Sequence, residues 1–164
     1  MRVISELLDL VIYSGEDNGV IFPPLEFVDC RRHITTSGCF QRGVKGIKAY
    51  DASRTHVSKL VAECWRASHI VLAASTYNNG IFTPIENLLI DLKAHAFQNR
   101  TWALIENGTW APQSGKLIRA MVEEMKDMTV LGDTITLKSA MQSAQENDLA
   151  ELADLIVANL KFEL

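Results

Sequence analysis

The segment Ile70-Val71-Leu72-Ala73-Ala74, followed directly by Ser75-Thr76-Tyr77-Asn78-Asn79-Gly80, decides the fold that we expect. A continuous apolar run of this length predicts a β-strand that is buried on both faces, as in the parallel sheet of an α/β protein. The polar stretch after it contains the dipeptide Asn79-Gly80, which is typical of a turn. The strand is therefore expected to end in an exposed polar loop.

The sequence on either side repeats this alternation of strand and helix. Residues 47–51 and 101–106 predict strands, and residues 129–137 predict a strand interrupted near Gly132. Apolar residues at helical spacing predict helices over 57–67 with Thr55 as the cap, from Pro84 onward, over 113–126 and over 147–160. Such alternation predicts a three-layer α/β sandwich with helices on both faces of a parallel sheet.

The first 44 residues do not follow this pattern. Residues 7–13 predict a short buried strand, but no helical stripe appears between Gly15 and Gly43. A parallel crossover requires a connection of about a dozen residues or more, usually a helix. We expect a single domain over residues 1–164 with an atypical region at 1–44.

Composition excludes several classes of protein. The chain of 164 residues is 48% hydrophobic and 22% charged, which is ordinary for a soluble globular protein. A net charge of −4 argues against a nucleic-acid partner. Apolar runs are far shorter than the ~20 residues that span a bilayer, and Glu6 and Asp9 interrupt any signal-peptide core. We expect no membrane contact.

The cysteine and histidine residues indicate neither a disulfide framework nor a metal site. Cys30, Cys39 and Cys64 are far apart in the sequence, which is typical of reduced thiols in a cytoplasmic protein. Cys64 lies in an apolar helical stripe and is expected in the core. The four histidines do not cluster with carboxylates at ligand spacing, so no metal site is predicted.

Two polar loops are expected where neighbouring strands end, and ligands of open parallel sheets bind there. The first is Ser75-Thr76-Tyr77-Asn78-Asn79-Gly80, and the second is Asn107-Gly108-Thr109-Trp110-Ala111-Pro112. Each combines one aromatic ring with amide or hydroxyl groups, which suits a flat heteroaromatic ligand that stacks on Tyr77 or Trp110. The alternative, that both are ordinary turns with their rings folded onto the surface, stays open.

These loops resemble those of a known family. Residues 71–82 are similar to the second flavin loop of the flavodoxin-like domain in A-type flavoproteins, the flavodiiron proteins. Residues 106–112 with Ser114-Gly115-Lys116 resemble the third loop of that domain, and residues 50–56 resemble the segment after its second strand. The resemblance extends from about residue 44 to residue 164.

The resemblance implies a flavodoxin-like fold with a parallel five-stranded sheet in the order 2-1-3-4-5 and FMN at the strand ends. Because the first strand of that order is central, residues 7–13 are expected to occupy it. In this family FMN passes electrons to a diiron centre, which implies a rubredoxin-like donor or a diiron domain as redox partner, and a homo-oligomer is compatible with it. No catalytic side chain is implied. The residues expected to line the isoalloxazine and ribityl side are Ser75, Thr76, Tyr77, Asn78, Asn79 and Gly80, and those expected at the opposite edge are Asn107, Gly108, Thr109 and Trp110.

The sequence departs from the family in two respects. It carries no counterpart of the diiron domain, so we expect no oxygen reduction at a metal by this chain. The family's phosphate loop is not recognisable, because the nearest candidate, residues 13–19, contains Glu16 and Asp17 where a phosphate would lie. We expect an FMN-binding electron-transfer module. The alternatives are a flavin-free scaffold or interaction domain and a small NAD(P)H-dependent flavin reductase.

Overall fold

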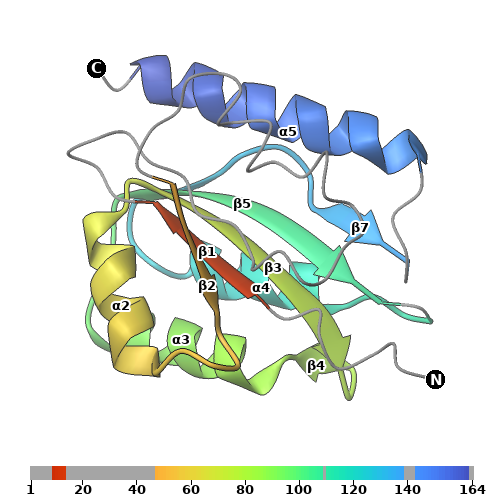
Figure 1. Cartoon of the computed structure of the whole chain (residues 1–164). Coiled ribbons are helices and arrows are strands. Elements are labelled where there is room, and N and C mark those ends of the chain that lie inside the picture. Colours follow the sequence, from red (N-terminus) through yellow and green to blue (C-terminus); the bar gives the residue numbers. More distant parts are fainter. Residues whose placement is uncertain (1–8, 14–46, 109, 139–142, 163–164) are drawn as a thin grey trace.

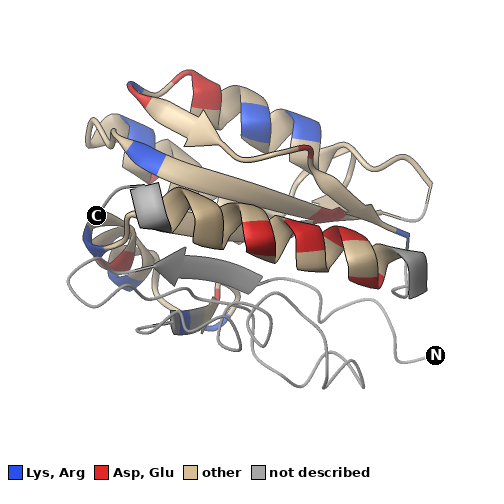
Figure 2. Ribbon diagram, turned by 90° about the horizontal axis from the view of Figure 1, so that it is seen from above, with Lys and Arg blue, Asp and Glu red and all other residues tan. Residues whose placement is uncertain are grey.

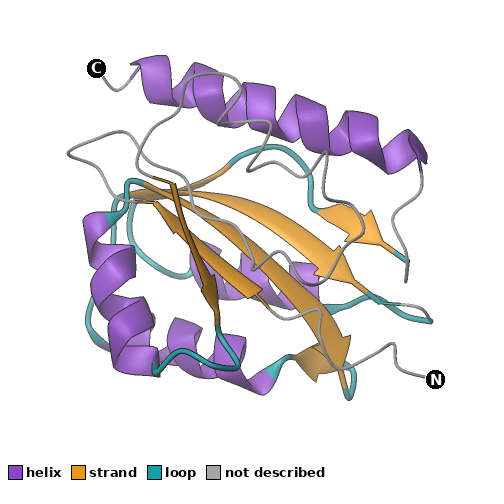
Figure 3. Ribbon diagram, in the orientation of Figure 1, coloured by secondary structure: helices purple, strands orange, loops and turns teal. Residues whose placement is uncertain are grey.

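The structure is a computed structural model that describes residues 9–13, 47–108, 110–138 and 143–162. A central sheet separates one layer of helices, α2, α3 and α4, from a second layer formed by α5 (Figure 1). The ribbon coloured by secondary structure shows the same three layers (Figure 3). The predicted α/β sandwich with helices on both faces is therefore confirmed.

The sheet has five positions in the predicted order. They are occupied by β2 (Ile47–Asp51), β1 (Asp9–Tyr13), β3 (His69–Tyr77), β5 (Arg100–Asn107) and β6 (Met128–Val130). The last position is shared with β7 (Ile135–Leu137), because β6 pairs with the beginning of β5 and β7 with its end. The predicted interruption of this strand near Gly132 is confirmed, and Gly132 there has a positive φ of 61°.

The direction of the central strand corrects the predicted parallel sheet. β1 occupies the predicted position between β2 and β3 but runs antiparallel to both neighbours, with Leu10 opposite Leu72, Ile12 opposite Ile70 and Tyr13 opposite Ile47. Antiparallel neighbours do not need the crossover helix that parallel neighbours require. The absence of a helical stripe between residues 15 and 43 of the sequence agrees with this arrangement. Residues 7 and 8 of the predicted strand lie outside the described residues.

The helices follow their predicted apolar stripes with shifted ends. They are α2 (Val57–Arg66), α3 (Thr83–Ala94), α4 (Ser114–Glu123) and α5 (Ser143–Phe162). The predicted cap of α2 is wrong by one residue, because His56, and not Thr55, accepts a hydrogen bond from the Ser58 amide through its ring nitrogen. Pro84 lies in the first turn of α3, where its missing amide hydrogen costs nothing.

The core lies on both faces of β3 and β5. Its largest fully buried side chains are Trp102, Phe97, Leu60, Ile70, Leu72, Ile85 and Leu88. Cys64 is fully buried, as predicted, and burial raises the pKa of its thiol well above the ordinary value. Among the described helices none is long and apolar enough to cross a membrane.

Helix α5 has one buried face and one acidic face. Its apolar residues Leu149, Leu152, Ala153 and Ile156 are buried against the sheet layer. Acidic residues recur along this helix (Figure 2), and Asp148, Glu151 and Asp154 are exposed. This helix therefore presents an exposed acidic face.

Candidate functional site

The two predicted loops begin side by side at one edge of the sheet. β3 and β5 are parallel, and Ser75 lies directly opposite Asn107 at their carboxyl ends. β7 pairs in parallel with the end of β5, from Ile105 to Asn107. β3, β5 and β7 therefore end at the same edge (Figure 1), which we call the carboxyl edge, and the opposite edge, where β3 and β5 begin, is the amino edge.

The first loop is a tight hairpin. β3 continues through Tyr77 and turns back into the short strand β4 (Gly80–Ile81), with Thr76 opposite Ile81 and Tyr77 opposite Gly80. Asn78 and Asn79 have positive φ angles of 48° and 58°, as in the two-residue turns that suit β-hairpins. The turn predicted at Asn79-Gly80 therefore lies one residue earlier, at Asn78-Asn79. It leaves the Tyr77 side chain 56% exposed.

Thr76, in the first loop, holds the beginning of α4. Its hydroxyl oxygen accepts hydrogen bonds from the backbone amides of Gln113 at 2.9 Å and Ser114 at 3.1 Å. The Ser114 hydroxyl, which is fully buried, donates to the Ala74 carbonyl at 3.2 Å. The Gln113 side chain makes no capping hydrogen bond. The end of β3 thus supplies the cap that α4 lacks in its own sequence.

Glu106, at the end of β5, supplies a second cap. One carboxylate oxygen accepts from the Gly115 amide and the other from the Thr136 hydroxyl, both at 2.8 Å, and Glu106 is only 8% exposed. A negative charge at a helix N-terminus is favourable because the amide dipoles point their positive ends toward it. A Cβ atom on Gly115 would lie 2.5 Å from Thr134 Cγ2 and 3.0 Å from Glu106 Oε2, so this close approach requires glycine.

The site residues predicted from the sequence do not include Glu106, Ser114 and Gly115. The signal for Glu106 was a charged residue that ends an otherwise apolar strand, and the signal for Ser114 and Gly115 was their position in the segment that resembles the third flavin loop. Neither signal gave the partners, because Thr76 and Thr136 are distant in the sequence.

The second loop leaves the sheet through a close-packed turn. Asn107 is buried at the end of β5, and the Gly108 amide donates to the Leu137 carbonyl at 3.1 Å. A Cβ atom on Gly108 would lie 2.9 Å from the Cα atom of Pro112. Thr109 lies outside the described residues. The side chain of Trp110 is 97% exposed, so this ring is not folded onto the described part of the protein.

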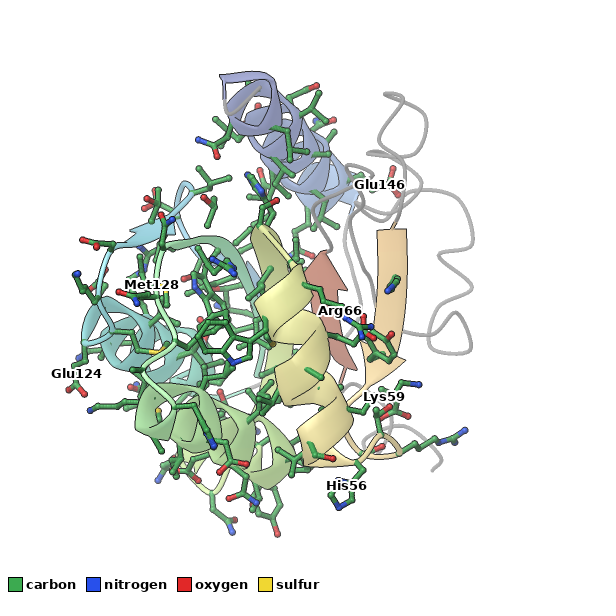
Figure 4. The ribbon with its side chains drawn as sticks, turned by 90° about the vertical axis from the view of Figure 1, so that its left-hand side faces the viewer. His56, Lys59, Arg66, Glu124, Met128 and Glu146 are labelled. Carbon is green, nitrogen blue, oxygen red and sulfur yellow. The ribbon has the colours of Figure 1, made fainter. Side chains whose placement is uncertain are left out.

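A separate charged cluster joins β2 to α2, on the side of the molecule shown in Figure 4. The buried Glu63 carboxylate pairs with Lys48 at 2.9 Å and with Arg66 at 3.1 Å. Burial opposes the ionisation of Glu63, but the hydrogen bond and charge of Lys48 and the charge of Arg66 hold its pKa below the ordinary value. Burial and the nearby Glu63 raise the pKa of Tyr50. These interactions explain why a carboxylate can be buried here, and they do not point to a ligand.

Metal binding has no support in the described part of the chain. Within it, no group of three histidine, cysteine, aspartate or glutamate side chains could hold a metal ion.

Solved structures show the fold, whereas no family model and no curated protein matches the chain. The flavodiiron core of Flv1 from Synechocystis sp. PCC6803 has a TM-score of 0.71 and 15% identity over 79% of this chain. The rubredoxin oxygen:oxidoreductase of Desulfovibrio gigas has a TM-score of 0.61 and 23% identity over 67% of this chain. An archaeal flavodoxin has a TM-score of 0.59 and 20% identity over 77% of this chain and 85% of its own length.

The match covers only part of the two larger proteins. This chain corresponds to 27% of the Desulfovibrio protein and 32% of the Synechocystis core. The likeness concerns the arrangement of strands and helices, and it agrees with the resemblance of the two loops. The chain has a flavodoxin-like fold that resembles the corresponding part of flavodiiron proteins.

Proposed function

We propose that the chain binds a flavin at the carboxyl edge of its sheet and exchanges electrons with a partner protein. FMN is the flavin that the resemblance implies, and the structural neighbours include a flavodoxin and flavodiiron proteins. The flavin, when bound, supplies the redox chemistry, and the protein supplies binding and orientation.

The exposure of two aromatic rings carries this proposal. Tyr77 is 56% exposed and Trp110 is 97% exposed, although large aromatic side chains normally bury much of their surface. Tyr77 is the last residue of β3 and Trp110 follows the end of β5, and open α/β sheets bind their ligands at such strand ends. A planar ring system stacked on either side chain would remove apolar surface from water.

Four of the remaining predicted residues divide into two groups. The exposed side chains of Asn78 and Asn79 offer amide groups to the polar edge of a flavin. Thr76 and Gly108, in contrast, already make hydrogen bonds within the protein that hold α4 and β7 in place. We assign the first group to ligand contact and the second to positioning the loops.

The partner is a redox protein in this proposal. One structural neighbour, from Desulfovibrio gigas, is a rubredoxin oxygen:oxidoreductase. A rubredoxin-like donor or a diiron domain is therefore the class of partner that we propose. A binding site for the partner close to the exposed rings would shorten the electron path to a flavin held there.

A titration of FMN into the purified protein, followed by quenching of flavin fluorescence, tests the proposal. Trp110→Ala and Tyr77→Ala should each weaken binding by about tenfold, because an aromatic pair contributes roughly 0.5–1.5 kcal/mol beyond its buried area. Trp65→Ala is the matched control. Trp65 is 41% exposed, but its carbonyl accepts from Arg100 at the beginning of β5, which places it at the amino edge.

The outcomes separate the three functions. Saturable binding that depends on Tyr77 and Trp110, and not on Trp65, supports the flavin module. No binding of FMN refutes the proposal and favours a flavin-free interaction domain. Reduction of the bound flavin by NAD(P)H alone would instead identify a flavin reductase.

A further inference from the structure

We infer that this chain recognises a flavin through its ring system and gives the ribityl phosphate no built site in the described residues, so that FMN and riboflavin bind with similar affinity. The inference rests on the proposed flavin binding and specifies which part of the ligand the protein recognises. Three observations at the carboxyl edge carry it.

The first observation is the direction of β1. In the flavodoxin-like arrangement that the sequence resembles, the phosphate loop directly follows the first strand. Here β1 ends at Tyr13 beside Ile47, and Ile12 lies opposite Ile70, near the start of β3. From Ile70 to Tyr77 the strand extends about 23 Å. The chain therefore leaves β1 at the amino edge, and the two exposed rings lie at the carboxyl edge.

The second observation concerns α4, which begins directly after the second loop and is hydrogen-bonded to Thr76 of the first. The amides at the start of α4 are one possible cradle for an anion at this edge. Thr76 already accepts from the amides of Gln113 and Ser114, and the Glu106 carboxylate accepts from that of Gly115. A phosphate placed here would have to displace these acceptors and would lie beside a like charge.

The third observation concerns the basic side chains near this edge. Arg54, which follows β2, is paired with Asp51 at 3.2 Å. Lys116 in the first turn of α4 and Lys138 after β7 are exposed. An ion pair in such an exposed position adds little affinity, about fivefold at most. These lysines can attract a phosphate only weakly through solvent.

The test compares three flavins on the same protein. FMN, riboflavin and lumiflavin, which lacks the ribityl chain, are titrated at low and at physiological salt and followed by flavin fluorescence. We expect the dissociation constants of FMN and riboflavin to agree within fivefold and their ratio to approach one as salt increases. FMN binding more than fivefold tighter than riboflavin at physiological salt overturns the inference while leaving the proposed function intact. Failure of every flavin to bind overturns the proposed function, and the inference with it.

Two sets of variants locate the recognition. Trp110→Ala should weaken the binding of FMN and the binding of riboflavin by the same factor, because both ligands carry the same ring system. The double variant Lys116→Ala and Lys138→Ala should change the ratio of the two dissociation constants by less than fivefold. A selective loss of FMN binding in the double variant would instead show that these lysines build a phosphate site.

Discussion

The direction of β1 can be tested by attaching a spin label to either end of the strand. Asp9→Cys and Tyr13→Cys are each labelled in a protein in which Cys30 and Cys39 are replaced by serine, while Cys64 stays because it is fully buried. The two sites are four residues apart, which is about 13 Å along a strand. The register of β1 with β3 places residue 13 beside the beginning of β3 and residue 9 toward its end.

The assay is paramagnetic broadening of backbone amide signals in a nitrogen-15 correlation spectrum. With the label at residue 13, the Ile70 amide should broaden more than the Ala74 amide. With the label at residue 9, the order should reverse. Because broadening falls with the sixth power of distance, a displacement of about 13 Å changes it by roughly tenfold or more.

A parallel β1 would invert both results. If it paired around the same central residues, Val11 and Val71, residue 13 would lie near Ala73 and its label would broaden Ala74 more strongly. That outcome would refute the antiparallel direction of β1. It would also remove the first of the three observations from which we infer that the protein recognises the ring system of the flavin and not its phosphate. The two labels act as mutual controls, because unfolding caused by one of them would abolish the pattern instead of reversing it.

Three further predictions concern the stability of the fold. Gly115→Ala should lower the free energy of unfolding in urea by about 1–3 kcal/mol, because its Cβ would lie 2.5 Å from Thr134 Cγ2; adding Thr134→Ser, which removes that methyl group, should restore most of the loss. Glu63→Gln should destabilise the protein by about 1 kcal/mol at pH 7. Since the folded-state pKa of Glu63 is lowered, its contribution is present above the ordinary value of about 4.3 and is lost as the pH falls through the folded pKa, so the difference in urea unfolding between the two proteins should shrink progressively as the pH is lowered below about 4.3. Cys64 should react with a thiol reagent only as fast as the protein unfolds, in a variant without the other two cysteines; rapid labelling of the native protein would contradict its burial.

Local patterns in the sequence were sufficient for most helices and strands. The apolar run from Ile70 to Ala74 and the stripes around Leu60 and Leu88 each require burial on a defined face, and the fold buries them. The boundaries were less predictable, because polar residues can continue a strand when a neighbour accepts their hydrogen bonds. Thr76 and Tyr77 extend β3 in this way by pairing with β4.

The direction of β1 could not be predicted, because a five-residue apolar strand has no pattern that distinguishes its two orientations. The only signal was indirect, namely the missing helical stripe between residues 15 and 43. The residues that cap α4 could not be predicted from the sequence either, for a different reason. Thr76 and Gln113 are 37 positions apart in the sequence, and only the fold brings a hydroxyl to an amide over such a separation.

The polar residues of the carboxyl edge therefore do not all serve the same purpose. Thr76, Ser114 and Glu106 make hydrogen bonds to backbone groups of the protein, so these polar groups already serve the fold. Tyr77 and Trp110 make the opposite contribution, because their exposure leaves apolar surface in water that only a ligand or a partner can cover. In the function that we propose, binding energy at this edge would come mainly from the two rings, and a ligand without a flat apolar face would gain little there.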